Sequence, residues 1–145
     1  MNKEKLILDV ASSIEAFEAS SDEMKDDEEV VLAAVTYCGD SLKFASERLR
    51  DDLKIVKVAD FEDIDALGYA SERLRNDKEL VLSSVKVWGK TLQFASDELR
   101  NDKQVVLAAI RARACSIEYA SDSLKKDSVF LKEARKIDSK VDEYL

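Results

Sequence analysis

Proline is absent from this sequence of 145 residues, and glycine occurs only three times. A β-sheet protein needs many tight turns, and such turns rely on these two residue types. Their scarcity argues against a sheet fold and favours a chain built from helices. The hydrophobic share of 46% and the charged share of 37% are typical of a globular protein with a core.

Histidine is also absent, which removes the side chain that most often serves as a general base or a metal ligand. No glycine-rich phosphate loop occurs, and the two cysteines, Cys38 and Cys115, stand in no metal or redox spacing. We therefore expect no enzymatic activity, no catalytic residue, no cofactor and no metal. Unpaired thiols and the lack of a recognisable signal peptide indicate a cytoplasmic protein.

Long apolar runs and a basic balance of charge are missing as well. No run approaches the ~20 apolar residues that a membrane-spanning helix needs, so we expect no membrane partner. The formal net charge is −8 at pH 7. Because nucleic-acid affinity depends on basic surface, we also expect no nucleic-acid partner.

The chain contains instead a repeat of 25 residues, since four similar segments align without a gap. These segments are Phe44 to Arg50, Tyr69 to Arg75, Phe94 to Arg100 and Tyr119 to Lys125. Five aspartates keep the same interval, namely Asp27, Asp52, Asp77, Asp102 and Asp127. So do Leu42, Leu67, Leu92 and Ile117. Residues at one position of successive repeats are called a column below.

This register divides the chain into consecutive repeats, and no linker separates them. They are 2–26, 27–51, 52–76, 77–101, 102–126 and the partial repeat 127–145. A unit this small cannot bury its apolar face alone, so the repeats must stack. We predict a single all-α domain over 1–145, an α-solenoid resembling a right-handed superhelix, with atypical repeats at its ends.

Each repeat is predicted to hold two helices. The recurrent aspartate caps the first, which is apolar nearly all round, as in Val30 to Val35. Gly39 and Gly89 stand where such a helix would end in the left-handed conformation. For the second helix two interpretations remain open. Either it runs on and contacts neighbours on two sides, or Ser46 ends it and caps a fresh short turn.

The motif Asp-x-x-Val-Val-Leu-Ala-Ala-Val runs from Asp27 to Val35. A second motif, Gly-x-x-Leu-x-aromatic-Ala-Ser-x-x-Leu-x-x-Asp, occurs at Gly39–Asp52 and at Gly89–Asp102. Together they resemble the repeats of the domain-of-unknown-function family 4116, over roughly residues 27–127. The resemblance implies an all-helical repeat fold and brings no catalytic residue or agreed activity.

Repeat 52–76 departs from this pattern, because Lys57 and Asp60 replace apolar residues and Phe61 replaces polar ones. One interpretation is a helix rotated by about one position, and the other is a groove in the stack. A charge left in the core would cost several kcal/mol, so we favour rotation. The rotated helix would supply Ile55, Val56, Val58, Ala59 and Phe61 to the core. We interpret Asp60, Glu62, Asp63 and Asp65 as a solvated helix end.

Acidic and basic residues recur three positions apart near the end of each repeat, and we interpret them as a ladder between repeats. The pairs are Glu47 with Arg50, Glu72 with Arg75, Asp97 with Arg100 and Asp122 with Lys125.

Binding specificity needs variation between repeats, and the variable columns lie around the end of the first helix. Aromatic and arginine side chains there are the usual anchors of interfaces. The candidate partner-binding residues are Tyr37, Phe61, Lys86, Trp88, Lys90, Arg111 and Arg113. We expect Trp88 to be partly buried.

The predicted function is that of a non-enzymatic scaffold that binds a protein or peptide, as a monomer or a weak homo-oligomer. The alternative is a small acidic neutralising protein of the immunity type, which masks a basic partner. The acidic N-terminal half, residues 2–76, supports this alternative. Net charge rises along the chain from −4 in residues 1–26 to +2 in repeat 102–126, and we interpret this gradient as drift among solvated positions. The other interpretation is that the gradient orients a charged partner or favours head-to-tail association.

Overall fold

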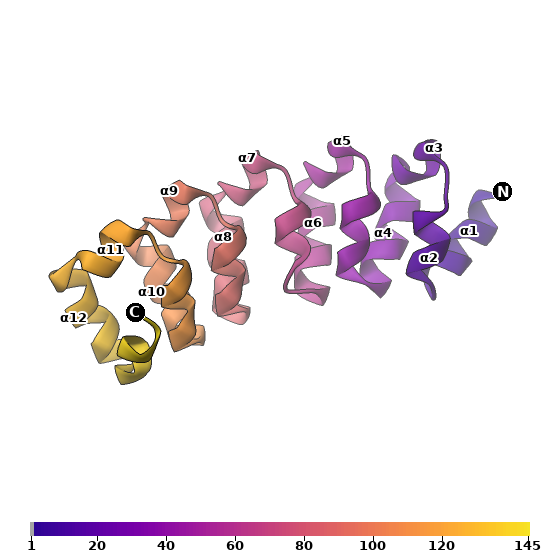
Figure 1. The fold of residues 1–145 in the computed structure, drawn as a ribbon. Helices are drawn as coiled ribbons and strands as arrows, with labels where there is room; N and C mark the ends of the chain where they lie inside the picture. The colour runs from indigo at the N-terminus through magenta and orange to yellow at the C-terminus, as the bar shows by residue number, and fades with distance from the viewer. Residues whose placement is uncertain (1) are drawn as a thin grey trace. The chain divides into compact units, whose positions relative to one another are not determined.

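A computed structural model describes residues 2–145, and every regular element in that range is a helix (Figure 1). The chain divides into two compact units, Met1–Leu74 (unit 1) and Arg75–Leu145 (unit 2). The predicted all-α repeat fold is confirmed, and successive repeats stack within each unit. The single domain predicted over 1–145 stays a prediction.

Unit 1 holds the first three repeats, in which η denotes a 3-10 helix. Its elements are α1 (Lys3–Val10), α2 (Ile14–Glu18), α3 (Asp22–Lys25), α4 (Glu28–Tyr37), η1 (Gly39–Phe44), α5 (Glu47–Arg50), α6 (Leu53–Glu62), η2 (Ala66–Tyr69) and α7 (Glu72–Arg75), whose last residue already belongs to unit 2. The long helices α1, α4 and α6 pack in that order.

Unit 2 holds two complete repeats and the partial one. Its elements are α8 (Lys78–Val87), η3 (Gly89–Phe94), α9 (Asp97–Arg100), α10 (Lys103–Ala112), η4 (Ala114–Tyr119), α11 (Asp122–Lys126), α12 (Ser128–Ile137) and η5 (Ser139–Tyr144). Here α8 packs on α10, and α10 packs on α12.

Each complete repeat has three segments, a long α-helix, a returning segment and a short α-helix. The extended backbone at Ala45 ends η1, and Ser46 then caps α5 by accepting a hydrogen bond from the Leu49 amide at 3.3 Å. The second of the two interpretations of the second helix is therefore confirmed. The short helices lie at one end of the long helices in both units, as α3 and α5 show in unit 1 and α9 and α11 in unit 2 (Figure 1).

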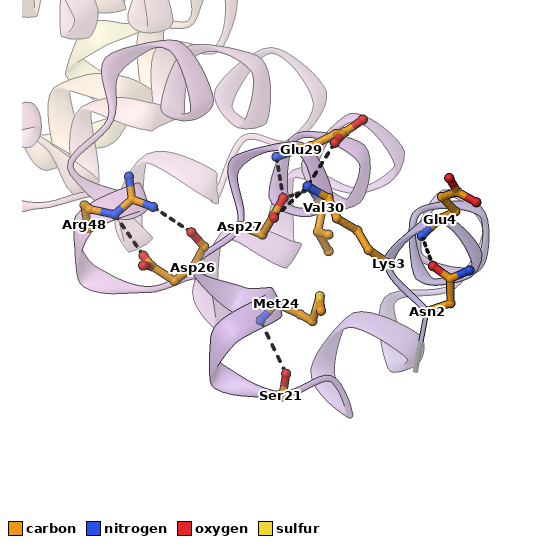
Figure 2. Close-up of polar contacts among 10 residues, drawn as sticks. All are labelled: Asn2, Lys3, Glu4, Ser21, Met24, Asp26, Asp27, Glu29, Val30 and Arg48. Atoms are coloured by element: carbon orange, nitrogen blue, oxygen red, sulfur yellow. Dashed lines mark hydrogen bonds and ion pairs between the residues drawn. The ribbon is translucent and has the colours of Figure 1, made fainter.

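The recurrent aspartate caps the long helices from α4 onward as predicted, and Asn2 caps α1. Asp27 accepts hydrogen bonds from the amides of Glu29 and Val30 at 3.1 and 3.3 Å (Figure 2). Lys3, from the preceding repeat, donates to the same carboxylate at 2.7 Å and holds the pKa of Asp27 below its usual range. In unit 2, Asp102 and Asp127 each pair with the lysine that precedes them by 24 residues. The cap thus also joins neighbouring repeats.

The serine that follows the recurrent alanine joins repeats in a second way. The Ser121 amide donates to the Arg100 carbonyl at 2.9 Å, and its hydroxyl donates to Asn101 at 2.5 Å. The same hydroxyl accepts from the Leu124 amide at 3.2 Å, which caps α11. Ser46, Ser71 and Ser96 repeat this arrangement. The Ala-Ser step recurs because its serine caps its own helix and holds the previous repeat.

The ladder predicted from acid–base pairs three positions apart is wrong in its partners. Asp97 with Arg100 and Asp122 with Lys125 lie within one short helix, at 3.4 and 3.8 Å. Ion pairs between repeats come from other columns, among them that of the capping aspartates and that of Arg48 with Asp26 (Figure 2) and its counterpart Arg73 with Asp51.

Replacing Ser121 by alanine is expected to destabilise the protein by about 1–2 kcal/mol, because an N-cap and a contact between repeats are both lost. Urea denaturation followed by circular dichroism measures this. Ser123→Ala is the matched control, since Ser123 is an exposed serine in the same helix. Equal stability of the two variants would contradict the role assigned to Ser121.

Repeat 52–76 keeps the register of the other repeats, so the rotated helix expected there is wrong. Its buried residues, Ile55, Val56, Ala59 and Asp60, occupy the columns that are buried in α4. Phe61 is 73% exposed, and Val58 is only half-buried. Rotation would break the cap that Asp52 forms with the amides of Lys54 and Ile55, and it would misalign α6 on α4. Cap and stacking therefore set the register.

The left-handed conformation expected at the ends of the long helices is also wrong, since no described glycine has a positive φ. Gly39 and Gly89 are needed for close approach instead. A Cβ atom on Gly39 would lie 2.2 Å from the Ala59 carbonyl oxygen of the next repeat. One on Gly89 would lie 2.6 Å from the Ala109 carbonyl oxygen. Only a residue without a side chain lets these backbones meet.

Candidate partner-binding surface

The predicted binding residues all lie where the long helices end and the chain turns back. Tyr37 in α4 and Phe61 in α6 belong to unit 1, and both are exposed. Lys86, Trp88, Lys90, Arg111 and Arg113 belong to unit 2. Trp88 is exposed over 42% of its surface, so, contrary to expectation, it does not belong to the core.

Three columns at this turn give unit 2 a strongly basic edge. They lie 9, 11 and 13 residues after the capping aspartate. In the three repeats of unit 2 these columns hold nine side chains, of which six are basic. We call these six the basic edge: Lys86, Lys90, Arg111, Arg113, Lys136 and Lys140. The other three are Trp88, Cys115 and Asp138. The basic edge lies where the long helices end, whereas the short helices α9 and α11 directly precede the starts of α10 and α12. A helix of ten residues is about 15 Å long, so the edge is well separated from the short helices.

The basic edge takes no part in the ion pairs that hold the repeats together. Ten other basic residues of the chain form ion pairs, whereas within residues 2–145 none of the six on the edge does. Five of the six are exposed, and Lys90 is half-buried. Their charges are therefore available to a partner.

A surface hollow of about 480 Å³ opens on this edge. Lys90, Arg113 and Lys140 come from three successive repeats and line it together with Cys115 and Tyr144. Two carboxylates also face it, those of Glu118 and Asp138. Asp138 is already engaged, because it accepts the Lys140 amide at 2.9 Å. The hollow therefore combines three basic and two acidic side chains around Cys115 and Tyr144.

Sequence reasoning identified part of this site. Lys90 and Arg113 were predicted, and the structure brings them into one hollow. Lys136, Lys140 and Tyr144 were missed. They belong to the partial repeat, and extending the columns of Lys86 and Lys90 into that repeat would have found the two lysines.

The same columns in unit 1 form an acidic edge, which we define as Glu15, Asp40, Asp63 and Asp65. No basic residue occupies these columns in unit 1. Burial raises the pKa of Asp40, but hydrogen bonds from Lys43 and Tyr69 outweigh it and keep that pKa below its usual range. Asp63 accepts the Asp65 amide at 3.0 Å. Unit 1 has 19 acidic and 9 basic residues, so its formal net charge is −10. Unit 2 has 12 acidic and 14 basic residues, so its formal net charge is +2.

Asp60 does not belong to the solvated helix end that we predicted with Glu62, Asp63 and Asp65. It is buried with 7% of its surface exposed, whereas Glu62 and Asp65 are exposed. Of the four residues, Glu62 and Asp65 are thus exposed, Asp63 is half-buried and Asp60 is buried.

Residues 2–145 contain neither a metal-binding cluster nor a membrane-spanning helix. No group of three or more cysteine, aspartate or glutamate side chains in this range is arranged to hold a metal ion. None of the helices described is long and apolar enough to cross a membrane.

A family model for a domain of unknown function, DUF4116, matches residues 11–59, 61–100 and 77–125. The second and third matches overlap, and the three together cover most of the chain. Searches among curated proteins and among solved structures give no match. The repeat register, the stacked helices and the extent of these matches agree, and the chain belongs to the DUF4116 family of domains of unknown function.

Proposed function

We propose that this protein is a non-enzymatic repeat module that binds an acidic segment of a protein partner through the basic edge of unit 2. The observation that carries the proposal is the concentration of six basic side chains without ion pairs in three columns. Other lysines of unit 2 are used between repeats, as Lys78 is with Asp102 and Lys103 with Asp127.

The side chains on this edge are suited to a protein surface. The guanidinium groups of Arg111 and Arg113 can each hold a carboxylate through two hydrogen bonds. Trp88 lies in the same column as Arg113, one repeat earlier, and exposes 42% of its surface. Partly exposed tryptophan beside arginine is a common composition of binding hot spots. The free thiols of Cys38 and Cys115 suit a cytoplasmic setting.

A defined probe tests the proposal. The probe is a fluorescein-labelled peptide of Glu and Asp residues interrupted by one Phe, and fluorescence anisotropy measures its binding. We expect saturable binding at 50 mM NaCl that weakens strongly at 500 mM NaCl, because salt screens exposed charges. The double variant Arg111→Glu/Arg113→Glu should weaken binding at least tenfold.

The matched control is Lys126→Glu/Lys132→Glu, which changes net charge equally in the same unit. Both lysines are exposed, and neither belongs to the basic edge. Its affinity should stay within twofold of the unmodified protein. If the control weakens binding as much as the edge variant, net charge and not the basic edge binds the probe, and the proposal fails.

The charge of −10 on unit 1 supports a second candidate, the acidic protein that masks a basic partner. A neighbouring gene for a basic toxin would favour this candidate over the first.

A further inference from the structure

The two edges place opposite charges at equivalent positions of the repeat. In the three columns of the turn, unit 1 has four acidic and no basic residues, and unit 2 has six basic and one acidic. Neighbouring columns that hold the fold, such as the capping aspartates, do not change between the units. The change of sign is therefore confined to surface positions that the fold leaves free.

The edges also match in spacing. Both repeat every 25 residues, and packed long helices lie about 8–10 Å apart. Acidic residues on the edge of one molecule therefore recur at the same interval as basic residues on the edge of another, although Asp40 is already paired with Lys43. Several ion pairs can therefore form at once.

An exposed aromatic side chain lies at the acidic edge, and a surface hollow lies at the basic edge. Phe61 lies beside Asp63 at the acidic edge, and 73% of its surface is exposed. In unit 2 the same column holds the basic residues Lys86 and Arg111. An aromatic side chain so exposed is a candidate anchor. The hollow of about 480 Å³ on the basic edge, with Tyr144 in its lining, offers a place for it.

We propose that the acidic partner of the basic edge is a second copy of this chain, whose acidic edge docks there and whose Phe61 enters the hollow. This inference rests on the proposed function and names its partner. Asp63, Asp65 and Glu15 form no ion pair within residues 2–145, so their carboxylates are available to Lys90, Arg113 and Lys140 of the other copy. Every copy carries both edges, so the contact closes into a dimer or continues as a chain.

Sedimentation velocity of the full chain from 5 to 200 μM tests this proposal. At 50 mM NaCl the weight-average mass should rise with concentration, and at 500 mM NaCl it should return to that of the monomer. Asp63→Lys/Asp65→Lys and Arg111→Glu/Arg113→Glu should each be monomeric at 50 mM NaCl. An equimolar mixture of these two variants should associate again, because their edges have exchanged charge. Phe61→Ala should weaken association at least threefold.

The matched control on unit 1 is Asp22→Lys/Glu23→Lys, an equal change of charge at exposed residues of α3, away from the turn. It should associate as the unmodified protein does. A monomer at every concentration and salt, or association that Asp63→Lys/Asp65→Lys leaves intact, overturns the inference. The acidic peptide distinguishes this failure from failure of the proposed function, since the peptide should still bind to the basic edge of a monomer.

Discussion

Replacing Phe17 by alanine is expected to destabilise the protein by about 3–5 kcal/mol, the range for deleting a buried aromatic side chain. Phe17 is fully buried, and its ring meets that of Phe44 edge-on at a centroid distance of 6.5 Å. It fills the column that Leu42 and Leu67 occupy in the next repeats of unit 1. Urea denaturation followed by circular dichroism should show a lower transition midpoint.

Two further substitutions show whether this loss comes from the core. Phe17→Leu introduces the residue that is usual in this column. It should lower the free energy of unfolding by much less than Phe17→Ala does. Phe61→Ala removes an equal side chain from an exposed site and should change stability by less than about 0.5 kcal/mol. If Phe17→Ala and Phe61→Ala are equally stable, the first repeat does not pack as described.

Adding a single methyl group at Gly39 is expected to cost about 1–3 kcal/mol, the usual range for overpacking. The new Cβ atom would meet the Ala59 carbonyl oxygen at 2.2 Å and the Asp63 Cβ atom at 2.7 Å. One of these neighbours is backbone in the next long helix, so it cannot rotate out of the way. The two repeats must therefore move apart. Thermal and urea denaturation of Gly39→Ala measure the loss.

The control for this variant is Ala114→Gly, in the same column of unit 2. Alanine is native there, so removing its methyl group should cost no more than about 1 kcal/mol. A Gly39→Ala variant as stable as the unmodified protein would show that the backbones of α6 and η1 do not approach so closely.

Different columns of one repeat serve stability and binding. Capping aspartates and serines hold neighbouring repeats together through hydrogen bonds, as Asp27 and Ser121 do. The turn columns contribute little to this, because their charged side chains on unit 2 form no ion pair within residues 2–145. Substitutions on the basic edge can therefore change binding without changing the fold.

Local chemistry explains what could be predicted from sequence. The 25-residue register, the all-α class, the capping aspartates and the family all follow from features that each repeat carries by itself. An aspartate followed by an apolar run is a cap wherever it occurs, and a column of Leu42 and its counterparts is apolar because it is buried. The variable turn also stood out from sequence, because variation against a regular background is visible without coordinates.

Contacts between repeats decided the features that could not be predicted from the sequence. The sequence by itself determined the helical class, the period and which columns vary. Only the tertiary structure decided that α6 keeps its register with Asp60 buried, since the stacking of a whole helix outweighs one unsuitable side chain. It also decided that Gly39 serves close approach and not a left-handed cap, because the Ala59 carbonyl oxygen that requires it belongs to another repeat. The gathering of Lys90, Arg113 and Lys140 into one hollow has the same origin, because three successive repeats supply them.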